Sequence, residues 1–214
     1  AGIGVFAAGF AVLDRVYPLD LSKAGEVSTV VADREGRMLR AFTTASGAWR
    51  LAVKPGEVSP LYLRMLLAYE DRRFRSHIGV DPLALARAAF QLVTRGHIVS
   101  GGSTITMQLA GLLDEDLKTA AGGRSVLQKV GQTVSAQLLE RSWRKDQILE
   151  AYLNNVPFRG EMVGIDALSR TLFGKAAHGL DDREAAVTAA LVRSPNARAA
   201  AVAHEVLEVV RGEV

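Results

Sequence analysis

Glu70 is the acidic residue whose neighbours in the sequence best suit proton transfer. Residues 60–79 predict one helix, on which Glu70, Phe74 and His77 fall at i, i+4 and i+7 and therefore share a face. Leucines in the two preceding turns make that face apolar. Partial loss of water would raise the pKa of the carboxyl group toward the range that suits a general base near neutral pH. The plainer interpretation is a solvated glutamate beside Arg73 at a helix end, and spacing alone favours it.

A second segment, residues 100–108, places glycines and hydroxyl residues at the start of a predicted helix. Gly101 and Gly102 allow the backbone to approach a ligand closely, and Ser103 or Thr104 can cap the helix. The free N–H groups and the positive end of a helix favour an anion at such a place. An ordinary loop with an N-cap explains the same residues, so this segment alone is weak evidence of a site.

The composition is that of a globular chain with a mild positive charge. The 214 residues are 49% hydrophobic and 23% charged, with a net charge of +3, which suits an anionic partner such as a phosphate or a membrane surface. The absence of cysteine excludes disulfides, thiolate metal sites and a cysteine nucleophile. The remaining histidines are scattered and no nucleic-acid-binding motif is present, so no nucleic acid partner is expected.

The first 13 residues carry no charge, and Asp14 and Arg15 follow them. A helix needs roughly 20 apolar residues to cross a bilayer, so this stretch is too short by itself. It is compatible with the outer half of a membrane anchor, the apolar part of a signal peptide, or a buried core helix.

The rest of the chain predicts a mainly α fold with a small β appendage near its N-terminus. Residues 27–43 predict two strands around a turn at 33–36. Ser59-Pro60 and Asp81-Pro82 each begin a helix, and the second of these ends near Gly96. Further helices are predicted for residues 103–113, 125–154, 161–173 and 181–192, with a polar loop at 114–123.

Four segments stand in the order and approximate spacing of the motifs of glycosyltransferase family 51, the peptidoglycan glycosyltransferase domain of class A penicillin-binding proteins. They are EDRRFRSHIGVDP (70–82), SGGSTITMQLA (100–110), RKDQILEAYLN (144–154) and GIDALSRTLFGK (164–175). The resemblance covers residues 27–197 and is greatest to the penicillin-binding protein 1C branch, with Met107 where most of the family has Gln. Four ordered motifs favour the functional interpretation of Glu70 over the plainer one.

The resemblance implies a lysozyme-like glycosyltransferase fold and an enzyme that polymerises lipid II with release of undecaprenyl pyrophosphate. It divides the chain into a remnant of a membrane anchor with its linker (1–17), a β-hairpin lead-in (18–55) and the glycosyltransferase domain (56–214). Glu70 matches the general base that activates the acceptor hydroxyl. The residues that match substrate-binding positions are Asp71, Phe74, His77, Ser103, Thr104, Gln108, Arg124, Lys129 and Gln132. Arg124 and Lys129 would face the diphosphate.

Two positions depart from the family pattern. Gln132 stands where the third motif usually has Glu, and an amide lacks the charge that helps to hold a divalent cation, which places the use of Mg²⁺ or Mn²⁺ by this chain in question. Val202 stands where the closing motif has Arg, so residue roles are not carried over beyond Asn196.

Three other functions remain to be weighed. Ser142-Trp143-Arg144-Lys145 matches an S-x-x-K acyl-transfer motif, but Ser142 is predicted in mid-helix and no K-[ST]-G follows, so the match is attributed to chance. A lysozyme-like lytic enzyme would also use one glutamate at a helix end. A non-enzymatic membrane- or anion-binding domain rests on charge alone.

The resemblance also implies partners and a location. The partners are lipid II, the growing lipid-linked glycan, the membrane surface and a C-terminal transpeptidase domain in the full-length protein. The location is the bacterial cytoplasmic membrane, with the catalytic domain on its outer face. Residues 83–95 mix apolar residues with arginines, as an interfacial helix does.

Overall fold

The computed structural model describes residues 21–95, 102–114 and 126–211. They form two compact units, each of which combines segments far apart in the sequence. The first unit consists of residues 21–23 and Arg73–Ile148, and the second of Ala24–Arg72 and the described chain from Leu149 onward. The mainly α fold with a small hairpin near the N-terminus is confirmed. The division at residues 17 and 55 stays a prediction.

The hairpin of the second unit forms where the sequence predicts it. Strands β1 (Val30–Ala32) and β2 (Met38–Ala41) pair antiparallel. In the turn, a carboxylate oxygen of Asp33 accepts hydrogen bonds from the backbone N–H groups of Glu35 at 3.1 Å and Arg37 at 2.8 Å. Gly36 adopts a φ of +78°, which favours glycine. Residues next to one another in the sequence are therefore enough to determine the position of this turn.

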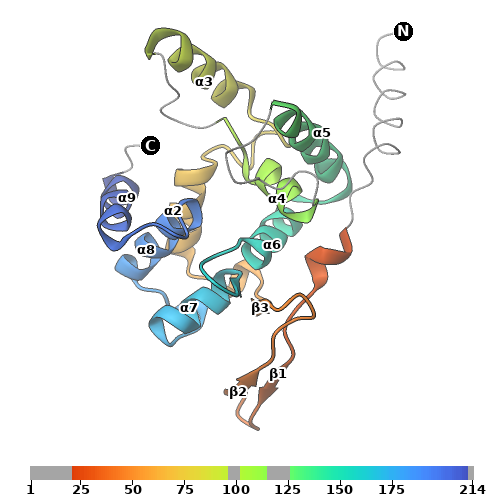
Figure 1. Cartoon of the computed structure of the whole chain (residues 1–214), viewed down its shortest axis with the longest axis vertical. Helices are drawn as coiled ribbons and strands as arrows, with labels where there is room; N and C mark the ends of the chain where they lie inside the picture. The colour runs from red at the N-terminus through yellow and green to blue at the C-terminus, as the bar shows by residue number, and fades with distance from the viewer. Residues whose placement is uncertain (1–20, 96–101, 115–125, 212–214) are drawn as a thin grey trace. The chain divides into compact units, whose positions relative to one another are not determined.

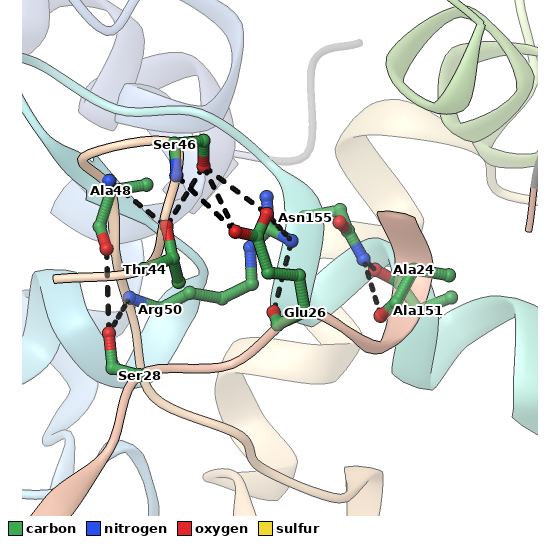
Figure 2. Close-up of polar contacts among 9 residues, drawn as sticks. All are labelled: Ala24, Glu26, Ser28, Thr44, Ser46, Ala48, Arg50, Ala151 and Asn155. Atoms are coloured by element: carbon green, nitrogen blue, oxygen red, sulfur yellow. Dashed lines mark hydrogen bonds and ion pairs between the residues drawn. The ribbon is translucent and has the colours of Figure 1, made fainter. Parts of the chain in front are cut away.

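Polar contacts of the second unit involve the base of the hairpin and the Ala151–Asn155 end of helix α6 (Lys145–Asn155) (Figure 2). The guanidinium of Arg50 donates to the backbone carbonyl of Glu26 at 3.0 Å. The backbone N–H of Arg50 donates to the Ser28 hydroxyl at 3.0 Å. The side-chain amide of Asn155 donates to the carbonyl of Ala151 at 2.8 Å and, more weakly, to that of Ala24 at 3.4 Å. These contacts fix the entry of the chain into the helical part.

Strand β3 (Trp49–Arg50) pairs in parallel with β4 (Met162–Val163). The prediction of a helix from residue 161 is wrong at its start, because helix α7 (Ile165–Phe173) begins only after β4. Gly164 separates the two elements with a φ of +85°, and a Cβ on it would lie 3.1 Å from the carbonyl oxygen of Asn154. A long-range strand pairing decides this segment, and helical periodicity does not report such a pairing.

Three helices pack together in the second unit: α2 (Pro60–Glu70), α8 (Asp182–Arg193) and α9 (Ala199–Arg211), which lie side by side in Figure 1. Short 3₁₀ turns at Pro55–Glu57 and Ala177–Gly179 connect neighbouring segments. Alanines form the buried face of α8, so its backbone can come close to α2. Helix α9 lies beyond the residues that the sequence analysis assigned.

Helix α2 ends at Glu70, so the prediction of one helix to Gly79 is wrong. Asp71 adopts an extended φ of −158°, and turns follow it. Downstream, the guanidinium of Arg73 pairs with the carboxylate of Asp81, and Phe74 is buried in the first unit. A continued helix could not make both contacts. Glu70, Phe74 and His77 therefore do not share a helical face.

The first unit contains helices α3 (Pro82–Arg95), α4 (Ile105–Leu113) and α5 (Val126–Ser142), of which α4 and α5 pack on each other. The predicted continuous helix 125–154 is wrong, because it breaks between α5 and α6. The backbone N–H of Arg144 donates to the side-chain oxygen of Gln147 at 3.0 Å, which caps the start of α6.

The predicted membrane anchor, residues 1–17, lies outside the described residues, as does most of the predicted loop 114–123. Among the described helices, none offers an apolar stretch of the length that a membrane crossing requires.

Candidate active site

Glu70 lies at the C-terminal end of α2 and is half-buried. The preceding turns of the same helix bury Tyr62, Leu66 and Tyr69, so an apolar and aromatic layer stands behind the carboxylate. Burial raises the pKa of the Tyr62 hydroxyl above its ordinary range, and the charge of Glu70 raises it further. Tyr62 therefore stays protonated. The apolar residues that were predicted to precede Glu70 therefore lie on α2 itself.

Asp71 is buried and terminates the helix. Its backbone N–H donates to the carbonyl of Leu67 at 3.0 Å and closes the last turn. The residue after Glu70 thus turns the chain away from the helix axis, which leaves the Glu70 side chain at the end of the element.

Arg193, the last residue of α8, lies beside the end of α2. Its guanidinium carbon is 5.4 Å from the centre of the Tyr69 ring, within the range of a cation–π contact. Burial lowers the pKa of Arg193, but contact with Tyr69 and the charges of Glu70 and Glu205 outweigh that effect and raise the pKa above its ordinary value. The sequence analysis did not name Arg193 or Tyr69.

Phe74 and His77 meet in the first unit. Their rings lie edge to face with centroids 6.3 Å apart, and the ammonium of Lys145 is 4.4 Å from the centre of the Phe74 ring. The carboxylate of Glu140 accepts hydrogen bonds from Lys145 at 2.5 Å and from the Thr106 hydroxyl at 2.7 Å. This largely buried arrangement fixes the segment after the first motif against α4 and the start of α6.

Thr104 is buried at the N-cap of α4. Its hydroxyl accepts from the N–H of Met107 at 3.1 Å and donates to the carbonyl of Gly79 at 2.5 Å. Gly79 in turn has a φ of +81°, and a Cβ there would lie 2.7 Å from the carbonyl oxygen of Ala136. The hydroxyl therefore holds the start of α4 to the end of the first motif.

The other predicted substrate residues of this unit lie near or on the packed pair α4 and α5. Ser103 and Gln108 are partly exposed, Lys129 is exposed and Gln132 is buried, with 2% of its surface accessible. Arg124 lies outside the described residues. The structure thus gathers Phe74 with His77, and the α4 residues with those of α5, in one unit. Glu70 and Asp71 belong to the other unit.

The use of Mg²⁺ or Mn²⁺ by this chain stays a prediction. No group of three or more histidine, aspartate or glutamate residues converges within the described ranges. Gln132 is a buried amide at the position where the family pattern has a carboxylate. Hard cations such as Mg²⁺ prefer charged oxygen ligands, which an amide at this position does not supply.

Comparison with known proteins decides the family. A model of the transglycosylase family matches residues 35–212 and so includes every residue discussed in this section. The chain belongs to the transglycosylase family. The mainly helical architecture agrees with the lysozyme-like fold that this membership implies.

Named relatives fall in the same group. Penicillin-binding protein 1C of Escherichia coli (strain K12) is 43% identical over 183 residues, 86% of this chain and 23% of that protein. Penicillin-binding protein 1A of Pseudomonas aeruginosa is 33% identical over 174 residues, 80% of this chain and 20% of that protein. The biosynthetic peptidoglycan transglycosylase of Thiobacillus denitrificans is 38% identical over 132 residues, 62% of this chain and 55% of that protein. The chain therefore spans only part of each relative's length, and the higher identity to the 1C protein agrees with the predicted branch.

Proposed function

We propose that this chain is a peptidoglycan glycosyltransferase that polymerises lipid II into glycan strands and releases undecaprenyl pyrophosphate. The observation that carries the proposal is the family match over residues 35–212, joined to a relative whose name is biosynthetic peptidoglycan transglycosylase. The position of Glu70 supports it, because a half-buried carboxylate at a helix end is suited to accept a proton.

In the proposed reaction the Glu70 carboxylate takes the proton of the acceptor's GlcNAc 4-hydroxyl group. That oxygen forms a bond to C1 of the terminal MurNAc of the growing chain, and the bond from C1 to the pyrophosphate oxygen breaks with inversion. The leaving group departs as a stable diphosphate, so it needs cationic or N–H stabilisation more than protonation. Lys129 and Arg124 are the proposed cations, and Asp71, Phe74, His77, Ser103, Thr104, Gln108 and Gln132 the remaining proposed substrate residues.

A membrane surface is the proposed setting, since the polyprenyl tail of lipid II stays in the bilayer. Helix α3 supports this, because Leu83, Phe90 and Val93 are 65%, 68% and 85% exposed. Arg87 and Arg95 on the same helix are also exposed. Apolar side chains that enter the headgroup region and arginines that meet anionic lipids are what an interfacial helix requires. We place the domain on the outer face of the cytoplasmic membrane, followed by a transpeptidase domain in the full-length protein.

A product assay tests the proposal. The purified chain is given fluorescent lipid II in detergent or liposomes, with and without a divalent cation, and separately given preformed glycan strands. We expect long strands from lipid II and no shortening of preformed strands. Shortened strands without polymerisation would instead establish the lytic activity. A chain that binds lipid II and changes neither substrate would contradict an enzymatic function.

A further inference from the structure

Three charged residues come together where α2, α8 and α9 pack in the second unit. Glu70 is the last residue of α2 and Arg193 the last residue of α8, while Glu205 lies within α9. Only Glu70 belongs to a motif on which the proposed function depends. Arg193 interacts with both carboxylates, and its effect on Glu70 is not part of the proposed reaction.

The position of Arg193 is fixed by an aromatic ring next to Glu70. The guanidinium carbon lies 5.4 Å from the centre of the Tyr69 ring, and Tyr69 directly precedes Glu70. Tyr69 is buried, so its ring gives the guanidinium a rigid platform at the end of α2. A guanidinium stacked on an aromatic ring loses less freedom when it faces a carboxylate than an unstacked guanidinium would.

Glu205 holds the other side of the arrangement. One of its carboxylate oxygens accepts a hydrogen bond from the Ser194 hydroxyl at 2.7 Å, and Ser194 caps the C-terminus of α8 directly after Arg193. The second oxygen is buried and has no hydrogen-bond partner among the described residues. A buried carboxylate oxygen needs a nearby positive charge, and Arg193 is a cation that interacts with Glu205.

We propose that Arg193 is a positioning residue for Glu70, held against the Tyr69 ring at the end of α2 so that its charge keeps the Glu70 carboxylate ionised. The inference rests on the proposed function, in which Glu70 must be deprotonated before it can accept a proton. A base beside buried Tyr62 and Leu66 loses part of its solvation, and a fixed cation offsets that loss. Glu205 weakens the effect of Arg193 on Glu70, because the negative charge of Glu205 partly offsets the positive charge of Arg193.

The test is the dependence of kcat on pH in the lipid II assay. Among the groups of its unit, Glu70 interacts with Tyr62 of α2 and with Arg193 of α8, and Arg193 interacts in turn with Glu205 of α9. The charged residues Asp71 and Arg72 follow Glu70 directly in the chain. Below the pKa of Glu70 the base is protonated, so activity falls on the acidic side. Arg193→Met removes a neighbouring positive charge, which raises that pKa and moves the acidic limb to higher pH by about one unit.

Two further variants sharpen the measurement. Arg193→Lys keeps the positive charge, so the acidic limb of this variant should lie within about 0.3 pH units of the wild type. That is a small fraction of the shift expected for the methionine variant. Glu205→Gln frees Arg193 for Glu70 and should move the limb to lower pH by less than the methionine variant moves it upward. Arg183→Met is the matched control, because Arg183 is an exposed arginine in the first turn of the same helix. The control should leave the limb and kcat unchanged.

A structural role would give a different result. If Arg193 only stabilised the end of α8, Arg193→Met would lower the unfolding temperature and leave the acidic limb in place, which would overturn the inference. Should that variant fail to fold, an unmoved limb in Arg193→Gln would overturn the inference equally. A wild-type chain without polymerase activity, or an active Glu70→Gln variant, would instead contradict the proposed function or the role of Glu70.

Discussion

The polar residues of the α4–α5 pair and those at the end of α2 are arranged in opposite ways. In the first set, Thr104, Thr106 and Glu140 are held inside the protein by short hydrogen bonds to neighbouring elements. In the second set, Glu70 is half-buried and Arg193 is exposed, and the contact between α2 and Arg193 is made through an aromatic ring. The two sets of polar residues therefore differ in task. The first set holds elements together, and the second remains at the surface where a substrate can reach it.

The largest expected effect on stability is at Glu140. Its side chain is 6% exposed and pairs with Lys145, which is 18% exposed. Glu140→Leu leaves a buried ammonium without its partner, so it should lower the free energy of unfolding by about 3 kcal/mol. Glu140→Gln keeps an acceptor for Lys145 and Thr106 and should cost about 1 kcal/mol. Chemical denaturation measures both, and equal, small losses would show that the α4–α5 set is not structural.

Thr104 should show a smaller effect of the same kind. Thr104→Ala removes the cap of α4 and the hydrogen bond to Gly79, which together stabilise the fold by about 1–2 kcal/mol. Thr104→Ser keeps the hydroxyl and is the control. If the alanine variant were as stable as the serine variant but bound lipid II more weakly, Thr104 would serve the proposed substrate contact and not the position of α4.

Ser142 should not be acylated by a β-lactam. The residue is the last of α5, and not in mid-helix as predicted, and its hydroxyl donates to the carbonyl of Leu138 at 3.4 Å. Lys145, which would have to activate it, is bound to Glu140 at 2.5 Å. Mass spectrometry after incubation with penicillin should find the unmodified chain. An adduct at Ser142 would show that this serine is reactive and would contradict the prediction.

Local signals in the sequence predicted the elements whose determinants lie next to one another. The turn at Asp33 and Gly36, the proline-initiated helices at 60 and 82, and the cap at Thr104 all depend on residues within a few positions. The fold class and the family could therefore be predicted before any contact was known. Glu70 can be proposed as a site residue from the sequence because its motif is long and ordered, and its role stays a prediction.

The errors concern segments that distant contacts decide. The end of α2 depends on the pairing of Arg73 with Asp81 and on the burial of Phe74, and β4 depends on its pairing with β3. Helical periodicity continues through both places, so the sequence alone predicted helix. The proposed role of Arg193 could not be predicted from the sequence for the same reason, because the packing of α8 against α2 brings it to Tyr69.

The central claim is that Glu70 is the base of the reaction and does not serve the fold. Its most direct test is Glu70→Gln, measured both for the rate of lipid II polymerisation and for the free energy of unfolding. Glu161→Gln, at an exposed glutamate of the same unit, is the matched control. We predict that the rate falls by roughly 10²–10⁴-fold in the Glu70 variant while stability changes by no more than about 0.5 kcal/mol, and that the control matches the wild type. A Glu70→Gln variant that polymerises lipid II at close to the wild-type rate would contradict the account.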